Sequence, residues 1–269
     1  MKIAVLAKQV PDTRNVGKDA MTAEGTVNRA ALDAIFNPED MNALEEALIM
    51  KDKCVLKDIP CSVTIITMGP PRASQILKES LYRGADEGIL LSDMKFAGAD
   101  TLATSYALAT ALRKINPDII FSGRQAIDGD TAQVGPQIAQ ELGLPQVTYA
   151  VEILDFNNES VKVKRALENG VESVESTLPA LITVCSSAAK PRYANAKFLM
   201  KYKNFNEFSV WNVDTIGGDV QRYGGAGSPT RVKKIENIVF TSKEARVIEP
   251  DDASLEGLIQ ELISNHTIG

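Results

Sequence analysis

The stretch Asp118–Gly143, DIIFSGRQAIDGDTAQVGPQIAQELG, carries the pattern that decides the fold. Asp118–Ser122 is an apolar run of strand length, and Thr131–Leu142 has the periodicity of a helix ended by Gly143. The loop between them contains glycines and aspartates. A buried strand, a loop and a helix in this order are one unit of a parallel α/β sheet.

The same unit recurs in the residues before this stretch. Strands are predicted at Ile3–Ala7, Ser62–Thr67 and Gly88–Leu91, and helices at Pro38–Met50, Arg72–Arg83 and Thr101–Ile115. A long polar segment, from about Gln9 to Arg29, follows the first strand. This alternation predicts a Rossmann-like parallel sheet with helices on both faces. Because ligands bind such sheets beyond the carboxyl ends of the strands, four loops are candidates for a site. They are Lys8–Thr13, Met68–Arg72, Ser92–Asp100 and Gly123–Thr131.

The second part of the chain has a different pattern. Val151–Phe156, Val161–Ala166 and Val171–Thr177 alternate apolar and polar residues, which predicts antiparallel strands. Leu181–Val184 is expected to rejoin the main sheet, and Asp252–Asn265 is predicted as an amphipathic helix.

Composition excludes several classes of function. The net charge of -6 argues against nucleic acid or an anionic membrane as the main partner, and no apolar run is long enough for a membrane span. The three cysteines lack the spacing of a disulfide framework or a zinc site, which favours a cytoplasmic protein. The only histidine, His266, stands near the end of the sequence, so we expect no catalytic residue and no metal ligand set. Any redox chemistry must then come from a bound cofactor.

The loop Gly123–Gly135 has two interpretations. The small residues and the free N–H groups around Thr131–Val134 suit a phosphate. The alternative is an ordinary strand–helix connection capped by Asp128 or Asp130. These carboxylates repel a phosphate unless they turn away, cap the helix or meet Arg124.

Other segments are also open to two interpretations. Asn37-Pro38-Glu39-Asp40 is typical of a helix start with Asn37 as N-cap, and it also places Asn37 and Asp40 near a ligand. The loops after Ala7 and after Thr67 either contact a ligand or only turn. The basic segment Lys190–Lys203 is either a solvated loop or a docking element for an acidic partner.

Taken together, these segments resemble the electron-transfer flavoprotein beta subunits. The matching motifs arrive in family order between Lys2 and Lys203: AKQVPDT at 7–13, NP at 37–38, TMGP at 67–70, RGAD at 83–86, GADTLAT at 98–104, GRQAIDGD at 123–130 and PRY at 191–193. The family's signature region corresponds to Val163–Thr183, where Asn169 departs from the usual glycine or acid.

The resemblance implies an adenine nucleotide alpha-hydrolase-like fold that works in a heterodimer with an FAD-carrying alpha subunit. The beta subunit holds either AMP or a second FAD. The second-FAD type takes a hydride from NADH and bifurcates the electrons, to ferredoxin or flavodoxin and, through the alpha-subunit FAD, to an acyl-CoA dehydrogenase-type enzyme. This chain resembles that type, because Gly129 stands where AMP-binding members look more acidic. The resemblance also implies domains at 1–210, which bind the nucleotide, and at 211–269, an arm whose C-terminal helix packs on the partner.

The resemblance carries over a set of site residues. Cofactor binding is expected at Ala7, Lys8, Val10, Pro11, Asp12, Asn37, Asp40, Thr67, Met68, Gly123, Arg124, Gln125, Asp128, Gly129, Asp130, Thr131, Ala132, Gln133, Val134 and Gly135. Partner binding is expected at Arg192, Tyr193, Ala196, Lys197 and Lys201, with Ala196 at the place of the family's larger apolar anchor.

Two other functions compete with FAD-based bifurcation. One is a non-bifurcating electron-transfer subunit that holds structural AMP. The other is a stand-alone adenine-nucleotide sensor, which has no use for the extra strands, the basic segment and the terminal helix.

Overall fold

The computed structural model of the protein describes residues 1–12, 33–230, 247–265 and 267–268. The part of the predicted polar segment from Thr13 to Arg29, and His266, lie outside the described residues.

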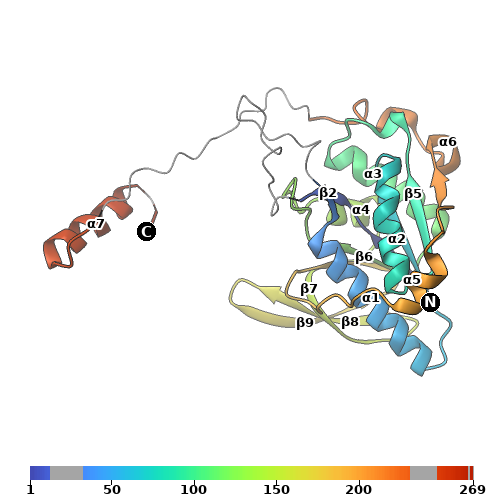
Figure 1. Ribbon diagram of the computed structural model, residues 1–269, viewed down its shortest axis with the longest axis horizontal. Helices are drawn as coiled ribbons and strands as arrows, with labels where there is room; N and C mark the ends of the chain where they lie inside the picture. Colours follow the sequence, from blue (N-terminus) through green and yellow to red (C-terminus); the bar gives the residue numbers. More distant parts are fainter. Residues whose placement is uncertain (13–32, 231–246, 266, 269) are drawn as a thin grey trace.

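One large sheet forms the centre of the described chain (Figure 1). Its order is β11 (Ser209–Trp211), β5 (Glu87–Leu91), β4 (Ser62–Met68), β1 (Lys2–Leu6), β6 (Ile119–Gly123), β10 (Ala180–Val184), β7 (Gln146–Phe156), β8 (Ser160–Leu167) and β9 (Gly170–Thr177). The strands from β11 to β7 are parallel, whereas β8 pairs antiparallel with both β7 and β9. The predicted α/β class, the antiparallel strands and the return of the chain to the main sheet are therefore confirmed.

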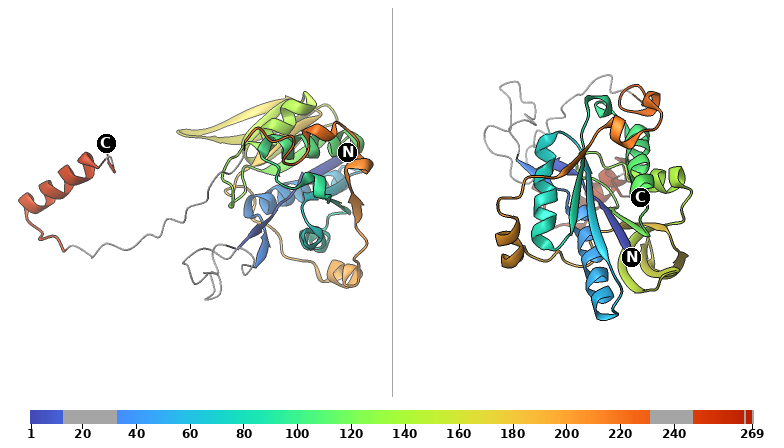
Figure 2. Two further views of the ribbon diagram at one scale, coloured as in Figure 1. Left: turned by 90° about the horizontal axis from the view of Figure 1, so that it is seen from above. Right: turned by 90° about the vertical axis from the view of Figure 1, so that its right-hand side faces the viewer.

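Helices cover both faces of the sheet, as predicted (Figure 2). One hydrophobic cluster joins the sheet to α1 (Pro38–Leu56) and α2 (Ser74–Arg83). A second cluster, on the other face, includes α3 (Thr101–Ile115) and α4 (Val134–Leu142). The apolar stripe of each helix is buried against β-branched strand residues, which is the main favourable free energy of such a layered domain.

The order of the strands creates a topological switch point. From β1 the chain builds outward through β4 and β5, and then crosses to β6 on the other side of β1. The loops after β1 and β6 therefore diverge at the carboxyl edge of the sheet and leave a crevice between them.

Smaller elements complete the description. They are β2 (Gln9–Pro11) with its antiparallel partner β3 (Ala34–Phe36), α5 (Ala196–Tyr202), α6 (Val213–Ile216), α7 (Asp252–Ser264) and the 3-10 turns Pro71–Ala73, Met94–Phe96 and Val220–Arg222.

Four predicted boundaries or types were wrong. The polar segment starts with the short strand β2, and the segment after Lys190 contains the helix α5 rather than only irregular chain. α2 begins after a 3-10 turn, and α4 begins at Val134 rather than Thr131. For β2 and α5, tertiary contacts override local propensity, since β2 pairs with β3 and α5 packs on α2.

The chain after β10 packs again on the α/β domain. β11 extends the parallel sheet beside β5, so the predicted domain boundary at residue 210 falls inside this strand. Further on, Tyr223 is buried between the rings of Phe96 and Tyr106. Residues 209–228 thus pack on the α/β domain.

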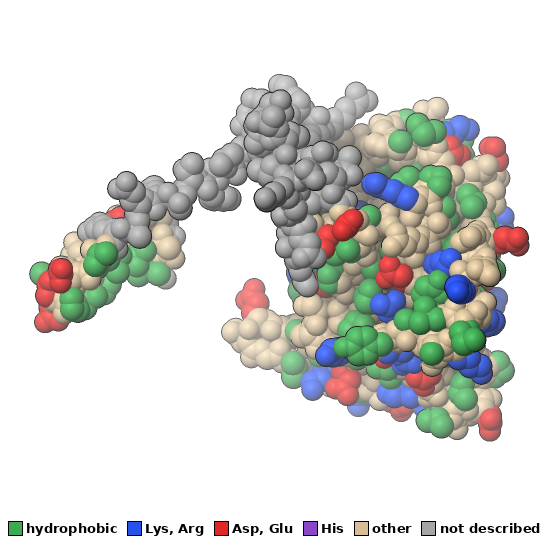
Figure 3. Space-filling view, viewed as in Figure 1, with side chains coloured by type: hydrophobic (Ala, Val, Ile, Leu, Met, Phe, Trp, Pro, Cys, Tyr) green, Lys and Arg blue, Asp and Glu red, His purple; other side chains and the backbone are tan. Residues whose placement is uncertain are grey.

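Helix α7 differs from the rest of the described chain, because none of its residues is buried. Figure 1 shows it apart from the sheet domain, and Figure 3 shows hydrophobic side chains on its surface. Leu255, Ile259 and Ile263 are each about half exposed, at 46%, 49% and 52%. Within the described residues, no helix is long and apolar enough to cross a membrane.

Candidate functional site

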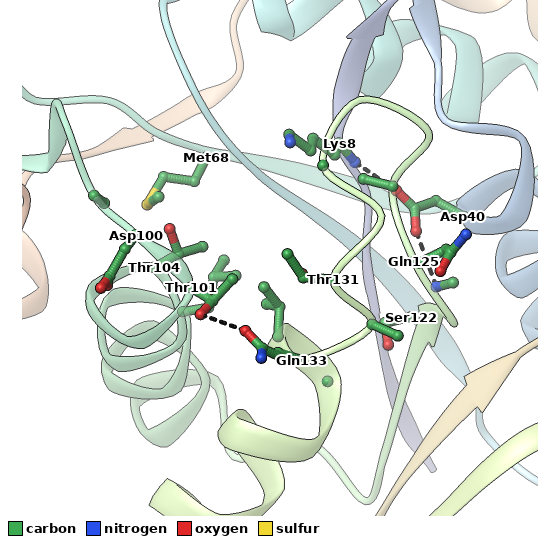
Figure 4. Close-up of a pocket in the computed structure, with 18 of the residues that line it drawn as sticks. Lys8, Asp40, Met68, Asp100, Thr101, Thr104, Ser122, Gln125, Thr131 and Gln133 are labelled. Atoms are coloured by element: carbon green, nitrogen blue, oxygen red, sulfur yellow. Dashed lines mark hydrogen bonds between the residues drawn. The ribbon is translucent and has the colours of Figure 1, made fainter. Parts of the chain in front are cut away.

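A cavity of about 470 Å³ lies at the switch point, between the loops after β1 and β6 and the first turns of α3 and α4 (Figure 4). This volume is within the range of small-molecule and cofactor pockets.

The cavity brings together most of the predicted cofactor residues. Those that line it are Ala7, Lys8, Asp40, Met68, Gly123, Arg124, Gln125, Gly129, Asp130, Thr131, Ala132, Gln133, Val134 and Gly135. Those that do not are Val10, Pro11, Asp12, Asn37, Thr67 and Asp128. Val10 and Pro11 belong to β2, and the Val10 side chain is buried.

Sequence reasoning missed one wall of the cavity. Phe96, Gly98, Asp100, Thr101 and Thr104 line it from the loop after β5 and the start of α3. That loop follows a parallel strand, and the motif at 98–104 is part of the family resemblance. Both signals were present, but the residues themselves suggest only a helix cap. Asp100 does cap α3, because its carboxylate accepts a hydrogen bond from the Ala103 N–H at 3.0 Å.

Asn37 stands at the predicted N-cap position of α1, but its side chain makes no capping hydrogen bond. Its amide instead donates to the Gln125 carbonyl at 2.9 Å, and its oxygen accepts from the Ile127 N–H at 3.2 Å. Glu39 accepts hydrogen bonds from the Gln125 N–H and the Arg124 guanidinium. The start of α1 is therefore a brace for the loop after β6.

Asp40 joins the two strands at the switch point. Its buried carboxylate accepts hydrogen bonds from the Lys8 N–H at 2.8 Å and from the Gly123 N–H at 2.9 Å. Burial raises the pKa of Asp40 to about 7, although these two backbone donors act in the opposite direction. The carboxyl group therefore holds the ends of β1 and β6 together beside the cavity.

The aspartates of the loop turn away from helix capping. Asp128 forms an ion pair with the Lys8 ammonium group at 2.7 Å, and Asp130 accepts a hydrogen bond from the Gln125 amide at 3.0 Å. Arg124 meets Glu39 at 3.1 Å rather than either aspartate. Since both carboxylates have partners within the loop region, their repulsion of an anion at α4 is reduced.

The backbone explains why α4 starts late. Asp130 and Ala132 have left-handed φ angles of 48° and 52°. This conformation is unfavourable for alanine by about 1–2 kcal/mol. Strained residues of this kind cluster at ligand sites. The first turn of α4 has Gln133 at its N-cap position, and this side chain makes no capping hydrogen bond.

Three glycines at the loop have different roles. A Cβ atom at Gly123 would lie 2.4 Å from the Asp40 carboxylate, so this glycine permits the approach of α1. A Cβ atom at Gly135 would lie 2.7 Å from the Thr183 side chain, so this glycine permits α4 to pack on the sheet. A Cβ atom at Gly129 would meet no atom of the described chain within 4 Å, although Gly129 lines the cavity. Neither Gly129 nor Gly135 has a positive φ angle, so backbone conformation does not require glycine at either position.

The donors around the cavity fit an adenine nucleotide. The uncapped N-terminus of α4 offers backbone N–H groups to a phosphate, and the hydroxyl groups of Thr101, Thr104 and Thr131 belong to lining residues. The buried hydroxyl of Ser122, which also lines the cavity, has no hydrogen-bond partner in the described residues. The open space at Gly129 admits a bulky ligand group. The hydrogen-bond donors fit AMP and the AMP half of FAD equally well, so only the open space at Gly129 favours the larger cofactor. Among the described residues there is no group of side chains that would hold a metal ion.

The predicted partner-binding residues lie on and before α5. Lys197, Lys201, Ala196 and Tyr193 are exposed. Arg192 is engaged within the chain, because its guanidinium pairs with Glu45 and Asp52, each at about 3 Å (3.0 and 2.9 Å). Its observed contacts anchor the segment to α1.

Comparison with known proteins gives consistent similarities. The family described as electron transfer flavoprotein domain matches residues 24–211. The chain is 42% identical over 268 residues, 100% of both chains, to the electron transfer flavoprotein subunit beta of Clostridium acetobutylicum. It is 42% identical over 282 residues, again 100% of both, to the acryloyl-CoA reductase electron transfer subunit gamma of Anaerotignum propionicum. It is 46% identical over 233 residues, 86% of both, to the caffeyl-CoA reductase-Etf complex subunit CarD of Acetobacterium woodii.

Proposed function

The chain belongs to the electron transfer flavoprotein family, among its beta subunits, and we propose that it holds FAD in the cavity at the switch point. In this proposal it works in a heterodimer with an alpha subunit that carries a further FAD. The observation that supports this proposal is the cavity itself, whose loop leaves open space at Gly129 beside the uncapped start of α4.

The residues of this chain bind and orient the nucleotide. The N–H groups at the start of α4 bind the phosphates, while Asn37, Glu39 and Asp40 hold the loop after β6 in place. When bound, FAD supplies hydride acceptance from NADH and electron transfer, to ferredoxin or flavodoxin and, through the alpha-subunit FAD, to an acyl-CoA dehydrogenase-type enzyme. Two relatives support an acyl-CoA partner, since their names associate them with acryloyl-CoA and caffeyl-CoA reductases.

The competing function is a non-bifurcating subunit with AMP in the same cavity. Its support is the cavity volume of about 470 Å³, which is in the lower half of the range for ligand pockets. FAD would extend beyond this chain toward the partner subunit. A stand-alone nucleotide sensor requires neither the partner nor a flavin.

Anaerobic turnover of the purified heterodimer tests the proposed function. NADH is added with ferredoxin, an acyl-CoA dehydrogenase and its enoyl-CoA substrate. We expect ferredoxin to be reduced only when the second acceptor is present. Electron flow from NADH to the dehydrogenase without any ferredoxin reduction would contradict bifurcation.

A further inference from the structure

The side chain of Ser122 is unusual among the residues that line the cavity. It is the last residue but one of β6, it is only 7% exposed, and its hydroxyl group has no hydrogen-bond partner in the described part of the chain. A buried hydroxyl without a partner is unfavourable because it has lost its hydrogen bonds to water, and native proteins seldom retain one without a reason.

The position of this hydroxyl relates it to α4. A Cβ atom built on Gly135 would lie 3.0 Å from Ser122 Oγ, so the hydroxyl group faces the first turn of that helix. Figure 4 shows Ser122 beside the start of α4. Val134 and Gly135 are the first residues of α4, and their N–H groups have no partner within the helix. The Ser122 hydroxyl therefore lies close to the first residues of α4, whose N–H groups are free of helical partners, and all three residues line the cavity.

The electrostatics of this point favour an anion. The positive end of the α4 dipole lies here, and the carboxylates of Asp40 and Asp130 accept hydrogen bonds from the Gly123 N–H and the Gln125 amide, which reduces but does not cancel their repulsion of an anion. A phosphate oxygen can accept from the hydroxyl and the two N–H groups together.

We propose that Ser122 Oγ donates a hydrogen bond to a phosphate oxygen of the nucleotide bound at the start of α4, and so helps to position the nucleotide. This inference rests on the proposed function, because it requires an adenine nucleotide in the cavity. Ser122 is a positioning residue that no feature of the sequence distinguished from other strand residues.

The proposal predicts opposite effects of Ser122→Ala on stability and on binding. Without nucleotide, the substitution removes an unpaired buried hydroxyl, so the Tm of the nucleotide-free heterodimer should rise by about 2–4 °C. With nucleotide, it removes a hydrogen bond to a charged group, so the Kd for AMP should rise about 10- to 100-fold. The Kd for adenosine, which lacks the phosphate, should change by less than about 2-fold.

The experiment is calorimetric titration of the nucleotide-depleted heterodimer with AMP and, separately, with adenosine. Ser80→Ala is the matched control, because Ser80 is also a buried serine, but its hydroxyl donates to the Ile76 carbonyl on α2, outside the cavity. This control should bind both probes like the wild type, without the rise in Tm.

Equal AMP affinity in the wild type and Ser122→Ala would overturn the inference and leave the proposed function intact. An equal loss of affinity for AMP and adenosine would also overturn it, because the hydroxyl group would then serve the base or the ribose. A wild-type heterodimer that binds neither probe would contradict the proposed function itself and the inference with it.

Discussion

Residues at the start of α1 make long-range hydrogen bonds that their local sequence pattern does not indicate. Asn37 and Pro38 occupy the expected first positions of the helix, yet the Asn37 side chain bonds to Gln125 and Ile127, 88 and 90 residues away. A hydrogen bond over such a sequence separation leaves no signal in a local motif. The polar residues that brace the cavity could therefore be located from the sequence, but their contacts could not.

Asp40 should give the stability of the protein a pH dependence. Its pKa rises from 3.8 to about 7 because the carboxyl group is buried, so between these values the native state binds a proton that the unfolded state has lost. The free energy of unfolding then falls as pH rises through this window, by an amount on the order of 4 kcal/mol for this group alone. Asp40→Asn should flatten the profile, as measured by urea unfolding at a series of pH values. Parallel profiles for the two proteins would show that Asp40 titrates normally.

A substitution at Gly129 should affect cofactor binding without affecting the stability of the fold. Because an added Cβ meets no atom of the described chain, Gly129→Asp should change the free energy of unfolding by no more than about 0.5 kcal/mol. It should nevertheless eliminate FAD from this subunit, since the carboxylate enters the cavity and repels the phosphates. We expect the variant heterodimer to retain one FAD, on the alpha subunit, and to lose NADH-driven ferredoxin reduction. A variant that keeps the full FAD content would place the cofactor away from Gly129.

At the scale of elements, the parallel strands were predictable because they are short apolar runs, and the helices between them because their apolar residues recur with a helical period. The start of α4 was not. Asp130 and Ala132 are left-handed although neither is glycine, and such a conformation is imposed by the surrounding structure rather than by residue type. The same limit applies to α5, which packs on α2 with the Phe198 ring close to Gly84 at the end of that helix.

The lysines on and after α5 should steer a dehydrogenase partner. Lys197, Lys201 and Lys203 are exposed in a chain with a net charge of -6. Replacing all three by Gln should slow electron delivery to the dehydrogenase by about 10-fold at low ionic strength, because exposed charges act mainly on the association rate. The difference should disappear at high salt, and NADH oxidation by artificial dyes should stay unchanged. Equal rates at low salt would exclude steering by these residues.

At the scale of the whole molecule, the alternation of elements predicted the layers of the sheet but not the order of every strand. β11 was not predicted, since three residues are too short for a periodic signal. The terminal helix was predicted from its period, and the structure leaves its apolar side chains exposed. The assignment of nucleotide binding to one domain and of partner binding to a separate arm stays a prediction.

Deletion of residues after Asp251 should weaken assembly with the alpha subunit. α7 exposes Leu255, Ile259 and Ile263 on one side, and an exposed apolar stripe of this kind is typical of a contact with another chain. The triple substitution of these residues by Ser should act like the deletion in gel filtration of the mixed subunits. Glu256→Ser with Gln260→Ser, on the neighbouring side of the same helix, is the control that should co-elute normally. Full co-elution of the truncated chain would contradict a role for α7 in assembly.

The nucleotide content of the wild-type heterodimer tests the central claim most directly. The intact complex is purified, its nucleotides are released with acid, and the products are separated by chromatography and counted against protein. FAD in the cavity of this chain predicts two FAD per heterodimer and no AMP. One FAD and one AMP per heterodimer would contradict the claim and identify the chain as a subunit that passes electrons only through its partner's flavin.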